Sequence, residues 1–452
     1  MDGGLFRTRW LSRKSRRKTG INEKETVNLG AENAVGNISS PNSDSSSNSI
    51  PPVDIPTTQT VLLLHGVKQQ YQLTDGYPVP DTRQDHELLV RSHTVGLNPI
   101  DWKAPDFGFG IPELPYISGR EATGAVVRAA KAPSRVKLGD QVIVISTDYR
   151  DQRKGTYQEY VVASDFNVVR IPPRVSLRDG ATLGVAYVAA SLALGVCLGI
   201  DFTHVHDGPD LLDLVRALPP GTLPSDIRDE CLSGIPASSR AKPGDWIAIW
   251  GGSSTSATIA IQLARLAGLR VASVVDSAKH GLRISDDPAL RPDLLVDSYD
   301  PERAIAVLRA NTGGKLRFGI DTRGRDTAEL LLRALAAEDV HLHNGAADVD
   351  SPPSTPPTEA VAPAHLVGLS GLPKGGRPGG VFFHVIPVKL FHEVPSIGET
   401  LCSWLERLLA DGVIAIPRII DVQEGLGSVN KGLDRMRRGE ISGGKLVVGL
   451  AT

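Results

Sequence analysis

The feature that most constrains the fold is the stretch 246–276, which follows the pattern of strand, small-residue loop, helix and strand. Its first five residues, Trp-Ile-Ala-Ile-Trp, are bounded by glycines, which is typical of a buried parallel strand. A tight turn after this strand would leave backbone N–H groups free to bind a phosphate at the start of the helix. The loop itself contains no large side chain and consists of Gly251, Gly252, Ser253, Ser254, Thr255, Ser256 and Ala257.

The second strand of this unit ends at Asp276, 25 residues after Gly251. In a dinucleotide-binding fold, a carboxylate at this place accepts hydrogen bonds from the adenosine ribose of NAD. Ser277 and Lys279 follow directly and would instead favour the 2′-phosphate of NADP. The loop departs from the Gly-x-Gly-x-x-Gly pattern, so a strand-helix-strand unit without a ligand stays open as an alternative.

Composition limits the other possibilities. A chain of 452 residues favours two domains, and a net charge of -2 gives no reason to expect a nucleic-acid partner. No run of about 18 uninterrupted apolar residues occurs, so we expect no membrane span. The cysteines lie far apart with no Cys-x-x-Cys pair, which argues against a disulfide framework and favours a reducing compartment such as the cytoplasm. They are Cys197, Cys231 and Cys402.

The first 58 residues differ in kind from the rest of the chain. Basic residues crowd positions 7–18, and a Ser/Asn/Pro tract covers 39–56. This composition buries too little apolar area to fold and predicts a disordered tail. A mitochondrial presequence is the alternative, because Trp10 and Leu11 interleave with the arginines, although Asp2 weakens it.

The remaining pattern predicts two structural modules. Alternating segments at 86–95, 124–128 and 141–146 indicate a β-rich module, and the apolar run 179–199 indicates a buried helix. After the loop, predicted strands at 294–296, 316–321, 340–343 and 365–372 alternate with helices, which favours a doubly wound parallel sheet. The strand at 445–450 needs a sheet to join, and we expect the β-rich module to supply it.

We therefore predict an α/β protein with a parallel sheet and a second, β-rich domain. The tail is 1–58, and the β-rich domain is 59–185 completed by 400–452. The nucleotide-binding domain is 186–399, with an insertion at 201–242 and an exposed Pro-rich insertion at 346–363. One short amphipathic helix is expected in the first insertion, around Leu211 to Leu218.

Short motifs in a fixed order carry a family resemblance. They are residues 98–103, 119–124, 139–142, 155–160, 242–246, 319–324 and 442–445. Together they resemble the medium-chain dehydrogenase/reductase superfamily over about 60–452. The resemblance implies a GroES-like domain followed by a Rossmann domain, and it leaves open a homodimer.

Within that superfamily, the resemblance also bears on zinc. Asn98 and Arg120 stand where zinc-dependent members have cysteine and histidine, and the third ligand falls near Gly184. A catalytic zinc needs about three protein ligands, so we expect no metal here. Arg120 beside Glu121 could form a buried ion pair in place of the metal.

The chain then looks similar to the zinc-free branch of quinone oxidoreductases and enoyl reductases, which includes stand-alone fungal enoyl reductases that serve polyketide synthases. The implied reaction is hydride transfer from NADPH, with NADH still possible, to the activated double bond of an enone, enal or enoyl thioester, or to a quinone. An aldehyde or alcohol reductase of the same fold is one alternative. A cofactor-binding sensor or partner subunit without turnover is another.

Without a metal, hydrogen-bond donors must stabilise the developing oxyanion. The resemblance places Asn98 and Lys103 beside the nicotinamide and Tyr187 beneath it, and Tyr157 is a further proton-donor candidate. Each has a plain structural alternative. Asn98 could shape the turn before a proline, Lys103 could be a surface lysine, and both tyrosines could be core residues.

Overall fold

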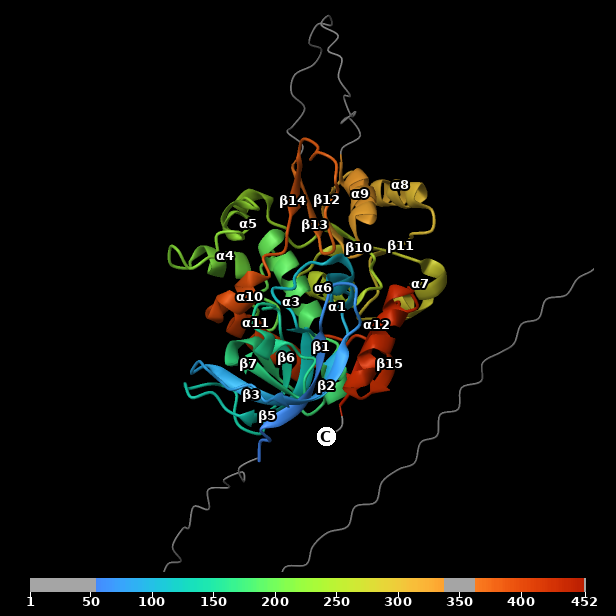
Figure 1. Ribbon diagram of the computed structural model, residues 1–452. Coiled ribbons are helices and arrows are strands. Elements are labelled where there is room, and N and C mark those ends of the chain that lie inside the picture. Colours follow the sequence, from blue (N-terminus) through green and yellow to red (C-terminus); the bar gives the residue numbers. More distant parts are fainter. Residues whose placement is uncertain (1–53, 337–361, 451–452) are drawn as a thin grey trace, which may run out of the picture. The chain divides into compact units, whose positions relative to one another are not determined.

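The computed structural model describes residues 54–336 and 362–450 (Figure 1). The strands are β1 Thr58–Leu64, β2 Gln72–Pro78, β3 Glu87–Gly96, β4 Tyr116–Ile117, β5 Glu121–Arg128, β6 Gln141–Ile145, β7 Tyr160–Ser164, β8 Val168–Arg170, β9 Trp246–Trp250, β10 Arg270–Val275, β11 Leu294–Asp297, β12 Leu316–Asp321, β13 Ala364–Gly368, β14 Val381–His384, β15 Ile419–Glu424 and β16 Lys445–Gly449. The α-helices are α1 Pro99–Phe107, α2 Leu177–Gly180, α3 Gly184–Leu192, α4 Leu211–Arg216, α5 Arg228–Ser233, α6 Thr255–Leu266, α7 Ser277–Asp286, α8 Pro301–Thr312, α9 Arg325–Leu335, α10 Lys389–Glu393, α11 Pro395–Ala410 and α12 Val429–Arg437. A π-helix, η3 (Ala193–Cys197), extends α3, and the short 3₁₀ turns are η1 Gln152–Lys154, η2 Asp165–Asn167, η4 Ala237–Ser239 and η5 Leu426–Ser428.

The predicted nucleotide-binding sheet is present. Its strands lie in the order β11-β10-β9-β12-β13-β14 and all pair in parallel, which is the doubly wound order of a dinucleotide-binding fold. Along β9, Ile247 and Ile249 lie in the core shared with α3 and α6. The alternate residues Trp246, Ala248 and Trp250 lie in the core shared with α8 and α9. Both faces are therefore buried, which is why this segment is apolar throughout.

The second large sheet joins the two ends of the chain. It runs β15-β16-β3-β5-β6-β8, with β7 also paired to β3. Val448 of β16 lies opposite Val95 of β3 in an antiparallel pair. The predicted partnership of the carboxyl-terminal strand with the β-rich module is confirmed, and in Figure 1 the red carboxyl-terminal segments lie with the blue amino-terminal strands.

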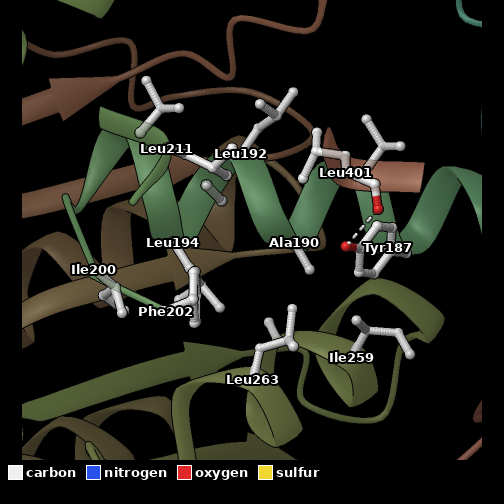
Figure 2. Packing of buried hydrophobic residues seen from close by; sticks show 14 of the residues in the cluster. Tyr187, Ala190, Leu192, Leu194, Ile200, Phe202, Leu211, Ile259, Leu263 and Leu401 are labelled. Atoms are coloured by element: carbon white, nitrogen blue, oxygen red, sulfur yellow. Dashed lines mark hydrogen bonds between the residues drawn. The ribbon is translucent and has the colours of Figure 1, made fainter. Parts of the chain in front are cut away.

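The predicted buried helix is helical but not continuous. It consists of α2, a turn, α3 and the π-helix η3. The span Leu177–Cys197 is long and apolar enough to cross a membrane, yet 89% of it is buried inside the protein. Figure 2 shows why, because side chains of α3 and η3 lie against Ile259 and Leu263 of α6. Burial of this kind is that of a core helix.

The other expectations are met in part. The amphipathic helix of the 201–242 insertion is α4, and a second helix, α5, follows it. The strand expected at 365–372 ends earlier, at Gly368, where the chain leaves the sheet toward Gly371, whose φ is positive. The predicted strand at 340–343, most of the loop at 346–363 and the amino-terminal tail up to residue 53 lie outside the described residues.

Candidate active site and cofactor groove

The loop between β9 and α6 requires glycine at its first two positions, 251 and 252. Gly251 has a φ of +80°, and a Cβ atom on it would lie 2.4 Å from the Thr322 hydroxyl oxygen. A Cβ atom on Gly252 would lie 1.9 Å from the Ser273 hydroxyl oxygen. Both distances are shorter than the contacts that Cβ atoms make in real structures, so the tight turn needs these two glycines.

The start of α6 is capped in the way that a phosphate-binding helix requires. The Ser254 hydroxyl accepts a hydrogen bond from the N–H of Ala257 at 3.1 Å and donates to the Thr322 hydroxyl at 3.0 Å. The amides at Thr255 and Ser256, in the first turn, have no carbonyl one turn back to bind. The helix dipole adds partial positive charge there.

The carboxylate predicted to meet the ribose is already neutralised by a neighbour. Asp276 caps α7, and its Oδ2 lies 2.7 Å from the ammonium of Lys279. The hydrogen bond from Lys279 lowers the pKa of Asp276. Ser277 turns its backbone N–H toward Asp297 Oδ1 at 3.0 Å. Asp276 therefore opposes a 2′-phosphate less than an unpaired carboxylate would.

These elements border a cavity of about 390 Å³ at the carboxyl ends of β9 and β10, which we call the nucleotide groove. Of the predicted cofactor residues, Gly251, Ser253, Asp276 and Lys279 line it. Sequence reasoning missed its remaining lining, which consists of Trp250, Val274, Val275, His280, Ser298, Tyr299, Pro301, Arg323, Thr327, Leu330 and Ser442.

The other predicted loop residues support the groove without lining it. Gly252 makes the turn, Ser254 caps the helix, and Ala257 is fully buried. Ser256 and Ser277 do not border the groove, and Thr255 borders a second cavity that shares Ser253. His280 Nε2 and the Ser442 hydroxyl lie 2.7 Å apart and join α7 to the chain before β16.

Asn98 lies at the centre of a buried polar cluster. Its Nδ2 donates to Glu121 Oε1 at 2.9 Å, and its Oδ1 accepts from Lys445 Nζ at 3.0 Å. Lys445 also donates to Glu121, whose second oxygen accepts from the N–H of Val185 at 3.1 Å. Glu121 is 0% exposed and Lys445 4%. We call Asn98, Glu121 and Lys445 the lysine cluster.

The ion pair expected in this region has a different cation. Glu121 pairs with Lys445 and not with Arg120, so the prediction of an Arg120–Glu121 pair was wrong. Arg120 stands at a bend just before β5, and its guanidinium lies over the ring of Tyr149, 5.9 Å from the ring centre. Burial lowers the pKa of Lys445 to about 7, and the charge of Asp101 opposes that shift.

Lys103 is placed differently from the lysine cluster. It lies on α1, which begins after Asn98, and its ammonium is 5.8 Å from the ring centre of Trp102. Among the described residues, no carboxylate pairs with it in a salt bridge. Lys103 is half-buried, so part of its side chain is open to a ligand.

The two candidate tyrosines are core residues. The Tyr187 hydroxyl donates to the carbonyl of Leu401 at 3.0 Å, as the dashed line in Figure 2 marks, and the residue is 0% exposed. Burial raises its pKa well above the ordinary value. Tyr157 is also fully buried and meets Tyr71 edge to face. The sequence-based assignment of Tyr187 as a catalytic residue is corrected, because its only proton already has an acceptor in the core.

A separate buried cluster offers metal-type ligand atoms. Cys197, Glu230 and His384 place one such atom each within 4.8 Å of one another. His384 Nδ1 lies 2.7 Å from Glu230 Oε1, and its Nε2 lies 2.9 Å from His365 Nδ1. These are hydrogen-bond distances, so the cluster ties α5 of the insertion to the sheet edge at β14 without needing an ion.

The comparison with known proteins accords with this architecture. Residues 84–173 match the alcohol dehydrogenase GroES-like domain. Trans-enoyl reductase caaB of Aspergillus niger is 28% identical over 402 residues, covering 87% of this chain and 97% of that protein. The chain resembles medium-chain dehydrogenase/reductases in its GroES-like domain and in its similarity to enoyl reductases over most of its length. Trans-enoyl reductase mycC of Thermothelomyces thermophilus is 27% identical over 418 residues, covering 87% of this chain and 97% of its own length.

Solved structures of a quinone oxidoreductase and an enoyl reductase have the same fold. The Escherichia coli quinone oxidoreductase complexed with NADPH gives a TM-score of 0.60 at 17% identity, covering 87% of this chain and 99% of that chain. The CurK enoyl reductase gives 0.59 at 15% identity, with the same coverage of both chains.

Proposed function

We propose that this reductase transfers hydride from NADPH to the activated double bond of an enone, enal or enoyl thioester, or to a quinone, without a metal. The observation that carries the proposal is that the same chain has an intact phosphate-binding turn and, at the positions expected for metal ligands, the lysine cluster. The similarity to enoyl reductases and quinone oxidoreductases supports the class of acceptor.

The nucleotide groove fits a dinucleotide. Gly251 and Ser253 line the groove, and α6 begins two residues after Ser253, so its positive end lies next to the groove. Three basic side chains, Lys279, His280 and Arg323, line the groove against the single carboxylate of Asp276. Because Lys279 already neutralises Asp276, we propose NADPH over NADH.

A reduced nicotinamide, when bound, supplies the hydride. The protein must then stabilise negative charge on the acceptor oxygen, and Lys103 is the residue proposed for that task because its ammonium is not held by a carboxylate among the described residues. Asn98 has both polar atoms engaged in the lysine cluster, so its proposed role is positional: it fixes the start of α1, which carries Lys103.

The donor set of the lysine cluster supports chemistry without zinc. A zinc site needs cysteine, histidine or carboxylate ligands with room for a cation among them. Asn98 offers an amide and Arg120 a guanidinium, and the Lys445 ammonium already contacts the carboxylate of Glu121. A metal cation in the lysine cluster would be repelled by the Lys445 ammonium.

The proposal is tested by following NADPH and NADH oxidation with purified protein in EDTA. The acceptors are a 2-enal, an enone, a quinone and a saturated aldehyde. We expect turnover of the enal, enone or quinone, with NADPH preferred. Turnover of the saturated aldehyde alone would instead identify a carbonyl reductase, and loss of activity on chelation would refute the metal-free mechanism.

Two lysine variants separate the role of Lys103 from a general charge effect. Lys103→Met should lower kcat with the best acceptor by about 100-fold, the scale found when one oxyanion donor is removed. Lys131→Met, at an exposed lysine, should leave kcat unchanged. Equal kcat values for both variants would remove Lys103 from the mechanism. Cofactor binding without turnover of any acceptor would favour a sensor or partner subunit.

The cellular setting belongs to the same proposal. We propose a cytoplasmic location, with the mitochondrion as the alternative, and a small-molecule substrate handled by a homodimer. A fluorescent fusion with and without residues 1–58 tests the location, because only a presequence would change it. Sedimentation of the full chain tests the dimer.

A further inference from the structure

A second cavity lies beside the nucleotide groove. It has a volume of about 190 Å³ and is lined from α6, α7 and the two chain segments that lead into β15 and β16. Ser253 lines both cavities, so the two spaces meet at the phosphate-binding turn. We call it the arginine cavity, and its polar lining consists of Ser253, Thr255, Thr258, Arg283, Asp287 and Arg418.

The two arginines of this cavity carry charge that the described residues do not balance. No salt bridge joins Arg283 or Arg418 to a carboxylate within the described parts of the chain. The Arg283 Nη2 atom is buried and has no hydrogen-bond partner there. Asp287 is the acidic residue of the lining, and its Oδ1 accepts instead from the N–H of Ala289 at 2.9 Å.

The arginines also repel each other. Burial lowers the pKa of Arg283, the charge of Arg418 lowers it further, and Asp287 opposes the shift only in part. A buried guanidinium N–H without an acceptor costs stability. Arg418 is exposed, so only Arg283 bears this cost. A phosphate is the ligand that matches two guanidinium groups and three hydroxyls in the lining of one cavity.

We infer that Arg283 and Arg418 bind a phosphate group of the dinucleotide cofactor in the arginine cavity. This inference rests on the proposed function, because it assumes that a dinucleotide occupies the neighbouring groove. Two phosphates of NADPH could be the source: the diphosphate bridge, which NADH shares, and the 2′-phosphate, which NADH lacks. The shared lining by Ser253 and Thr255 at the start of α6 favours the diphosphate.

The test measures cofactor binding to the full-length protein without any acceptor substrate. The variants are Arg283→Gln, Arg418→Gln and the control Arg265→Gln. Arg265 lies on α6 outside both cavities, and its guanidinium donates to the carbonyl of Pro288 at 2.8 Å. Dissociation constants for NADPH and NADH are taken from fluorescence titrations, and inorganic pyrophosphate is titrated as a competitor.

We expect each cavity variant to raise the dissociation constant by about 10- to 100-fold, as loss of a charge-assisted hydrogen bond predicts. A rise for both cofactors, with weaker competition by pyrophosphate, assigns the diphosphate. A rise for NADPH alone assigns the 2′-phosphate, and both results support the phosphate site. The control should bind like the wild type.

Thermal unfolding separates this site from a structural role. Without cofactor, Arg283→Gln should melt no lower than the wild type, because it removes a repelled and unpaired guanidinium, while the rise in Tm on adding NADPH should shrink. If the wild type binds the dinucleotide and both cavity variants bind it with the same dissociation constants, the inference is overturned and the proposed function stays intact. A wild type that binds neither dinucleotide would overturn both.

Discussion

The lysine cluster makes a sharp prediction about stability. Glu121→Gln removes the carboxylate that contacts the Lys445 ammonium and keeps nearly the same side-chain shape. Both residues are buried, so water cannot replace the lost partner. Breaking a buried ion pair on one side costs about 3–5 kcal/mol, and we expect Glu121→Gln to lose that much of the free energy of unfolding at pH 7.

The stability of the wild type and of Glu121→Gln should depend on pH with the same sign. Burial lowers the pKa of Lys445 to about 7 in the folded protein, below its ordinary value of 10.5. Between these values the unfolded chain binds more protons than the folded chain, so the stability of both proteins rises with pH from about 7 toward 10. The double variant Glu121→Gln/Lys445→Met has no ammonium to bury, so it should recover most of the stability and lose this pH dependence.

Chemical denaturation followed by tryptophan fluorescence measures these differences in the full chain. The four proteins of the double-mutant cycle are compared at pH 7 and pH 9. A loss below about 1 kcal/mol in Glu121→Gln would refute the reasoning, since only a solvent-screened pair contributes so little. A double variant as unstable as the sum of both single variants would refute it as well.

Three further changes test other parts of the structure. Gly251→Ala should raise the dissociation constant for NADPH at least tenfold in a titration, because its φ is +80° and the new Cβ atom would lie 2.4 Å from the Thr322 hydroxyl oxygen. Glu230→Gln should cost about 1–3 kcal/mol in denaturation, because it weakens the acceptor of buried His384, whereas the control Asp226→Asn, in an exposed pair with Lys389, should unfold at the same denaturant concentration as the wild type. Burial alone would raise the pKa of Glu87, but hydrogen bonds from Arg153 and two backbone N–H groups lower it to about 2. Its contribution is therefore present above about pH 4.5 and lost toward pH 2, so Arg153→Met should flatten acid unfolding, followed by circular dichroism, in that window.

The parallel sheet could be predicted because its signals are local. β9 is apolar along its whole length since both of its faces are buried, and the glycines after it are required by contacts with Ser273 and Thr322 that a Cβ atom would violate. The boundaries were less predictable. The run 179–199 has one composition throughout, yet it breaks into α2, α3 and the π-helix η3, because packing against α6 decides where the helix turns.

The candidate site was predictable only where it follows the order of the chain. The turn at Gly251, the carboxylate at Asp276 and Lys279 lie within one strand-helix-strand unit, so spacing places them together. Arg418 and Ser442 reach the same region from distant segments, and Arg283 lies one helical turn after Lys279 on α7, but no local pattern marks any of the three. Tyr187 was assigned to catalysis because the family resemblance places its segment beneath the nicotinamide, but its hydroxyl donates to the carbonyl of Leu401, 214 residues away.

Lys445 is a residue of the lysine cluster that no sequence pattern indicates. In the sequence it is one lysine after two glycines at the start of a strand, a position that is usually exposed. The antiparallel pairing of β16 with β3 brings it to Asn98 and Glu121, 347 and 324 residues away, and there it is a buried cation in contact with a carboxylate. The Lys445 ammonium compensates the charge of Glu121 and holds the turn at Asn98, from which α1 and Lys103 begin. Because Lys445 acts through Asn98, a shortened or neutral side chain at 445 should disturb hydride transfer by misplacing Lys103, and it should do so without weakening the binding of NADPH in the nucleotide groove.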